Sequence, residues 1–151
     1  MLKPVHVIGA GMTKFGRLDE SIIDLAKDAS LRALEDSQAS SEKIDHILVA
    51  SQNPDEFTGI GHLSTLMTDE LGIVPAGGTR IESGPSSGAS AIEAAFAMIR
   101  SGLAELVLVT GVEKMSEVSR ERASAILAKM ISKKNETRYG ATPASLAALV
   151  A

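Results

Sequence analysis

Cysteine is absent from all 151 residues, and this absence excludes several kinds of chemistry at once. Without thiols the chain has no disulfides, no thiolate metal ligands and no thiolate nucleophile. Aromatic residues are also scarce, at 3% of a chain that is 44% hydrophobic. The core must therefore close mainly through small aliphatic side chains, which favours helices that lie directly on a β-sheet.

An excess of positive charge is lacking too, because 15 basic residues face 19 acidic ones for a net charge of -4. We therefore expect no nucleic-acid partner, and any phosphate recognition would have to be local. No apolar run reaches the roughly 18 to 20 residues that cross a bilayer, and Lys3 and the glycines at 9 and 11 interrupt the region where a signal peptide is apolar. We expect a cytoplasmic protein with no membrane span and no metal site.

Short apolar runs alternate with helical patterns as far as residue 111. β-Rich runs at 5–8, 47–50, 79–83 and 106–109 predict four strands. A capping-box start at Ser21 predicts a helix, and weaker helical spacing follows at 63–71. Residues 89–99 are alanine-rich and include one charged residue, Glu93, so they predict a helix buried nearly all round. This alternation predicts an α/β fold with mostly parallel strands.

The composition changes after residue 112. Residues 113–138 contain seven basic and four acidic side chains, a local balance of +3, and predict one helix near 121–131. We expect this segment on the surface. A last apolar run at 146–151 has no terminating signal, as though an element had been cut. The sequence thus predicts a core over 1–112 and a truncated appendage over 113–151.

Two segments resemble a known family. Residues 80–89 read Arg-Ile-Glu-Ser-Gly-Pro-Ser-Ser-Gly-Ala, and residues 111–116 read Gly-Val-Glu-Lys-Met-Ser. The first resembles the strand, Cys-Ala-Ser-Gly and buried helix of thiolases, and 101–116 resembles their segment ending in Gly-Gly-Val-Glu-Lys-Met-Ser. Residues 7–16 and 140–149 resemble the family's first turn and its Gly-x-Thr-Phe-Pro segment. The chain therefore resembles the first part of a thiolase-superfamily polypeptide, nearest to its sterol-carrier and archaeal branch.

This resemblance implies a thiolase-like layered α/β/α domain, the incomplete N-terminal half of a family polypeptide with a loop-region appendage. Four strands would take the order 3-2-1-4. The resemblance also implies coenzyme A or acyl-CoA as substrate, with no covalently bound cofactor. The strand at 106–109 would have an open edge, which proteins normally cover, and the strand at 79–83 would pair across a dimer axis. We expect a homodimer or higher oligomer, or a partner chain that supplies the missing thiolase half.

The same resemblance places Pro85 where the family has its nucleophilic cysteine. A proline side chain has no nucleophile, donor or acceptor, and proline is common in the first turn of a helix. Ser86 and Ser87 remain candidate nucleophiles, but a hydroxyl needs a positioned base and oxyanion donors, and the sequence identifies neither. The three histidines, which are His6, His46 and His62, fit packed or surface positions better than a catalytic one.

Two further motifs have alternative interpretations. Gly9-Ala10-Gly11 begins like a dinucleotide fingerprint, but Lys14 stands where the third glycine belongs, so close backbone approach is favoured. The basic appendage lies where the family's loop region helps to hold coenzyme A. By that resemblance four side chains are candidate coenzyme A contacts, and a solvated surface is the alternative: Lys129, Lys133, Lys134 and Arg138.

Three functional hypotheses follow. The first is a thiolase-like N-terminal domain or subunit, of the acetyl-CoA C-acyltransferase family of lipid metabolism, that acts on or scaffolds acyl-CoA without cysteine chemistry of its own. The second is a piece of an active acyl-CoA acyltransferase or carbon–carbon lyase that a second chain completes. The third is a non-catalytic truncated paralogue with an interaction role. The family transfers acyl groups, and we expect this chain alone to be inactive.

Overall fold

The computed structural model describes residues 4–150. Within them one parallel sheet contains β1 (His46–Ala50), β2 (Gly77–Ile81) and β3 (Val107–Gly111), in the order β2-β1-β3. The middle strand pairs along its whole length on both sides, with His46 opposite Gly77 and Val107. The predicted parallel α/β fold is therefore confirmed.

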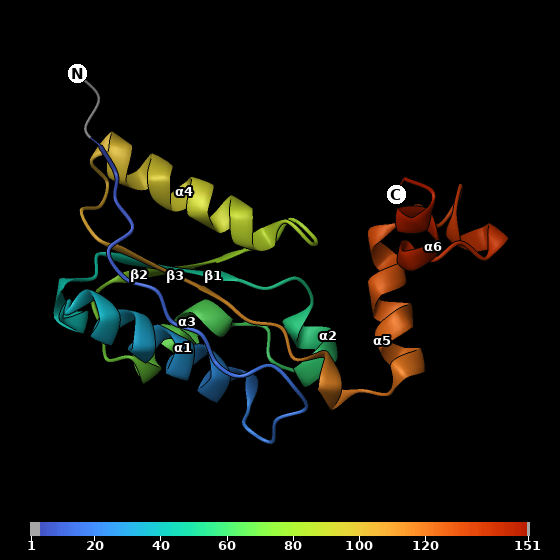
Figure 1. Cartoon of the computed structure of the whole chain (residues 1–151), viewed down its shortest axis with the longest axis horizontal. Helices are drawn as coiled ribbons and strands as arrows, with labels where there is room; N and C mark the ends of the chain where they lie inside the picture. Colours follow the sequence, from blue (N-terminus) through green and yellow to red (C-terminus); the bar gives the residue numbers. More distant parts are fainter. Residues whose placement is uncertain (1–3, 151) are drawn as a thin grey trace.

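Helices cover both faces of the sheet (Figure 1), with α4 (Ser87–Ser101) on one face and α1 (Ile22–Ser37) and α3 (Leu63–Glu70) on the other. Because successive side chains of a strand point to opposite faces, Ile47 and Val49 enter the core beneath α1 and α3. Leu48 and Ala50 pack instead against α4. All four side chains are nearly inaccessible, so β1 supplies both halves of the core.

The start of α1 follows directly from its sequence. The Ser21 hydroxyl accepts the Asp24 N–H at 3.1 Å, and the Asp24 carboxylate accepts the Ser21 N–H at 3.2 Å, which completes the predicted capping box. The hydrogen bond from the Ser21 hydroxyl, followed by that from its backbone, lowers the pKa of Asp24. The helix then buries Ile22, Ala26 and Ser30 against the sheet.

The remaining helices are short. α2 (Pro54–Thr58) follows β1, and α5 (Arg120–Leu127) and α6 (Pro143–Ala148) lie near the C-terminus. Residues 119–150, here called the arm, stand to one side of the core, beyond the end of the sheet where α2 and the start of α4 lie (Figure 1). Single helical turns complete the order: η1 (Ser41–Lys43), η2 (Met115–Glu117), η3 (Ala128–Met130) and η4 (Thr137–Tyr139). Within residues 4–150 no helix combines the length and apolar character needed to span a membrane.

The prediction of a first strand at 5–8 is wrong, and with it the four-strand order 3-2-1-4. Residues 4–20 belong to no strand, because β1 and β3 pair directly and leave no place between them. The segment lies against α1, where a Cβ on Gly9 would stand 2.5 Å from the Ala33 carbonyl oxygen and one on Gly11 would stand 2.3 Å from that of Ala29. The close backbone approach expected of these glycines is confirmed.

Two burial predictions are also wrong. α4 is buried on one face only, through Ser87, Ala91 and Ala95, whereas Ile92 is 61% and Phe96 49% exposed. On this outer face the Arg100 guanidinium lies 5.3 Å from the centre of the Phe96 ring. Lys114 was expected on the surface, but it is only 6% exposed, because its ammonium group pairs with Glu117 at 2.6 Å and donates to the Glu20 carbonyl oxygen.

Asp45 fixes the beginning of β1 against the beginning of β3. One oxygen of its carboxylate accepts the Glu105 N–H at 2.6 Å and the Leu106 N–H at 2.9 Å. These two hydrogen bonds lower the pKa of Asp45, and the bond from the Leu106 N–H has the larger effect on it. The aligned beginnings of the strands also align their carboxyl ends, where the candidate site lies.

Candidate functional site

A pocket of about 550 Å³ opens at the carboxyl ends of β1 and β2. We call it the strand-end pocket. In open α/β sheets ligands bind outside this edge, where the loops that follow the strands diverge. Three segments line it: Gln52, Asn53 and Asp55 after β1, Arg80 with residues 82–85 at the end of β2, and Lys129 with Met130 from the arm.

Pro85 lies at the mouth of α4 and lines the strand-end pocket. It precedes the N-cap Ser86, so it stands just outside the helix and not in its first turn as predicted. Gly84, at φ +59°, turns the chain immediately before it. The position that resembles the family's nucleophile therefore presents a ring without a reactive atom to the pocket.

The two neighbouring serines are held by the backbone of the same turn. Ser86 donates its hydroxyl to the Ser83 carbonyl oxygen at 2.7 Å. Ser87 donates to the Gly84 carbonyl oxygen at 2.6 Å and accepts the Ser83 N–H at 2.9 Å. Both hydroxyl protons thus face carbonyl oxygens and not a base.

No histidine lines the strand-end pocket. His46 opens β1 at the opposite edge of the sheet, where its ring nitrogen lies 2.9 Å from the Thr79 hydroxyl. His62 precedes α3, and His6 lies exposed in the N-terminal segment. The described residues also contain no group of three or more acidic or histidine side chains arranged for a metal ion. Within residues 4–150, neither the Ser86 nor the Ser87 hydroxyl donates to a histidine or a carboxylate.

The charges in the strand-end pocket are nearly balanced. Arg80 lies 3.8 Å from the Asp55 carboxylate, and Lys129 of the arm pairs with Glu56 of α2. Glu82 accepts the Gly84 N–H at 2.6 Å, which fixes the turn before Pro85. A phosphate in this pocket would have to compete with these carboxylates. The pocket therefore suits a polar, uncharged group better than a phosphate.

The structure separates the four predicted basic residues. Lys129 reaches the strand-end pocket, whereas Lys133, Lys134 and Arg138 lie exposed further along the arm. The Arg138 guanidinium stands 4.7 Å from the centre of the Tyr139 ring. Arg80, Asp55 and Glu82 were missed as site residues. The sequence could have indicated them, because Arg80 and Glu82 lie at the end of a predicted strand and Asp55 follows another, and ligands bind at this edge of a parallel sheet.

The sequence matches the model of the thiolase N-terminal domain over residues 5–150. A parallel sheet with helices on both faces and a helix mouth at its carboxyl edge defines a thiolase-like α/β domain. The chain belongs to the thiolase family.

Curated relatives agree with this assignment. The chain is similar to the acetyl-CoA acetyltransferase of Methanocaldococcus jannaschii, with 33% identity over 151 residues that cover 99% of this chain and 38% of that protein. The acetyl-CoA acetyltransferase of Methanothermobacter thermautotrophicus is 35% identical over 78% of this chain and 31% of its own length. The chain thus spans less than two fifths of these relatives.

Solved structures share the fold. The 3-oxoacyl-[acyl-carrier-protein] synthase III of Aquifex aeolicus superposes with a TM-score of 0.61 at 27% identity, covering 73% of this chain and 36% of that one. The Ltp2-ChsH2(DUF35) aldolase superposes with a TM-score of 0.62 at 21% identity, over 89% of this chain and 38% of that one. The likeness to the aldolase concerns the fold alone.

We predict that Ser87→Ala lowers the free energy of unfolding by about 0.5–1.5 kcal/mol, because it removes the buried hydroxyl that accepts the Ser83 N–H and donates to the Gly84 carbonyl oxygen. Ser90→Ala, on the same helix, is the matched control and should change it by less than about 0.5 kcal/mol. Urea unfolding of both variants measures the difference. Equal stability of the two variants would show that the Ser87 hydroxyl does not hold this turn.

Proposed function

We propose that this chain is a thiolase-type subunit that binds acyl-CoA without forming a covalent intermediate. The observation that carries the proposal is the mouth of α4, where Pro85 lines the strand-end pocket beside two serines whose protons face backbone carbonyl oxygens. The relatives named acetyl-CoA acetyltransferase support acyl-CoA as the ligand class. Within the described residues this arrangement favours binding over acyl transfer.

The arm supports recognition of the phosphates of coenzyme A. Lys133, Lys134 and Arg138 are exposed on one short stretch, and none has an acidic partner among residues 4–150. Cationic side chains of this kind form charge-assisted hydrogen bonds with phosphate oxygens. The adjoining turn η3 reaches the strand-end pocket through Lys129 and Met130. One extended ligand therefore has phosphate partners on the arm and a polar pocket at its other end.

A buried hydrogen-bond acceptor supports placing the uncharged part of coenzyme A in the strand-end pocket. Asn53 lines the strand-end pocket, and its Oδ1 is buried without a hydrogen-bond donor among residues 4–150. Buried acceptors of this kind are rarely left unpaired in native proteins. The pantetheine portion of coenzyme A carries amide N–H groups, which are suitable donors.

The fold also favours contact with a second protein chain. The outer face of α4 exposes Ile92 and Phe96, and Leu103 beyond the helix is 77% exposed. β2 and β3 each have one unpaired edge within the described sheet. Apolar patches and open edges of this kind mark interaction surfaces. We propose that a second copy covers the outer face of α4, or that a chain supplying the missing thiolase half displaces it.

We predict that acetyl-CoA binds saturably and that Lys133→Glu with Lys134→Glu weakens its affinity about tenfold, because phosphate partners become repulsive. Arg120→Glu with Arg122→Glu makes the same change of charge on α5 and should have little effect. Isothermal titration calorimetry at fixed ionic strength measures both pairs. Equal affinities for the two double variants would contradict the phosphate site on the arm. Acetyl transfer that appears only with an added chain would favour the completed enzyme instead.

We predict that the chain alone self-associates at low micromolar concentration and that Phe96→Glu shifts it toward the 15.7 kDa monomer, because the charge would have to be buried in the interface. Leu31→Glu, at a 48% exposed position on α1, is the control and should leave the mass unchanged. Size-exclusion chromatography with light scattering measures the mass. A clean monomer of the unmodified chain would rule out this interface.

A further inference from the structure

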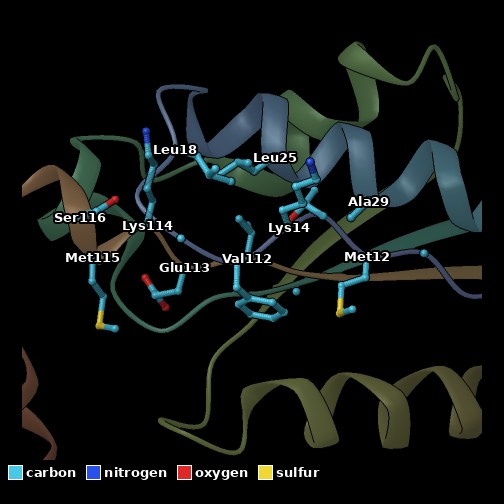
Figure 2. A pocket seen from close by; sticks show the side chains of 15 residues that line it. Met12, Lys14, Leu18, Leu25, Ala29, Val112, Glu113, Lys114, Met115 and Ser116 are labelled. Atoms are coloured by element: carbon cyan, nitrogen blue, oxygen red, sulfur yellow. The ribbon is translucent and has the colours of Figure 1, made fainter.

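A second cavity lies away from Pro85, between the N-terminal segment, α1 and the loop that follows β3 (Figure 2). We call it the N-terminal pocket. Its volume is about 360 Å³, within the range of about 300–1,000 Å³ typical of small-molecule sites. It shares no lining residue with the strand-end pocket.

The walls of the N-terminal pocket are largely aliphatic. Leu18, Leu25 and Val112 line it from three different segments of the chain. Met12 and Met115 line it as well and are 66% and 46% exposed. These large apolar side chains come from distant segments and remain exposed around one concave site. Such an arrangement indicates a surface that an apolar ligand would cover. Methionine adapts its shape readily to such a ligand.

One uncompensated cation lies among these apolar walls. Lys14 lines the pocket and has no acidic partner or hydrogen-bond acceptor among residues 4–150. The other lysine, Lys114, is already neutralised by Glu117 at 2.6 Å.

The one carboxylate in the pocket is turned away from Lys14. Figure 2 shows Lys14 extending toward α1, on the side of Leu25, whereas the Glu113 carboxylate points to the opposite side with Met115. Glu113 is also engaged, because it accepts the Gln52 N–H at 2.7 Å. The anion that would complement Lys14 is therefore missing from the described chain.

From this juxtaposition we propose that the N-terminal pocket binds a free aliphatic carboxylate, with the Lys14 ammonium group on its head and Leu18, Leu25 and Val112 along its carbon chain. The apolar walls account for the aliphatic part, and the unpaired charge accounts for the anionic head. Binding is reversible and involves no covalent step. The site is separate from the strand-end pocket, so acyl-CoA binding and carboxylate binding can fail independently.

The proposal is tested with sodium octanoate as the probe, titrated into the unmodified chain in the absence of coenzyme A. Saturable binding is expected, and hexanoate, which is two methylenes shorter, should bind about fifteenfold more weakly, because each buried methylene contributes about fourfold. Octan-1-ol, which has the chain without the charge, should bind more weakly than octanoate. Binding that is absent, or independent of chain length, would overturn the proposal.

Lys14→Gln should weaken octanoate binding about three- to fivefold and leave octan-1-ol binding unchanged, because only the charged head meets this exposed side chain. Lys43→Gln removes a charge from η1 and serves as the control. Circular dichroism confirms that each variant is folded. Equal octanoate affinity in the two variants would refute the role of Lys14.

Discussion

The pairing of β1 on both sides is the constraint on which the rest of the structure depends. Because β2 and β3 both bond directly to this strand, its five residues fix the positions of both neighbours and of the helices above and below. Ile47 and Val49 form the core under α1 and α3, and Leu48 and Ala50 form the core under α4. Each face is filled by small or branched side chains, which suits a chain with few aromatic residues.

This arrangement also sets the chemistry. The loops that follow β1 and β2 meet at the carboxyl edge of the sheet, where α4 begins and Pro85 stands. The hydroxyl and guanidinium groups there are already engaged, since the serine hydroxyls face carbonyl oxygens and Arg80 lies near Asp55. A site whose groups are satisfied internally can position a ligand, but it has no atom prepared to attack one. The proposal of binding without covalent chemistry rests on that geometry.

Local patterns predicted three of the strands and the capped start of α1, because these depend on neighbouring residues. The strand expected at 5–8 failed, since Gly9 and Gly11 let the backbone pack on α1 and β3 took the place beside β1. The apolar composition of α4 indicated that both faces of the helix favour burial. It did not indicate which surface covers the outer face. The resemblance to thiolases located Pro85, whereas the pairing of Arg80 with Asp55 depends on contacts between separate elements that no local pattern encodes.

We propose above all that the chain holds acyl-CoA without becoming acylated. Denaturing mass spectrometry after incubation with saturating acetyl-CoA tests this most directly, because noncovalent ligands are lost on unfolding whereas an acyl-enzyme survives. We expect an unchanged intact mass of 15.7 kDa. An acetyl group found on Ser86, Ser87 or any other residue in a stoichiometric amount would contradict it.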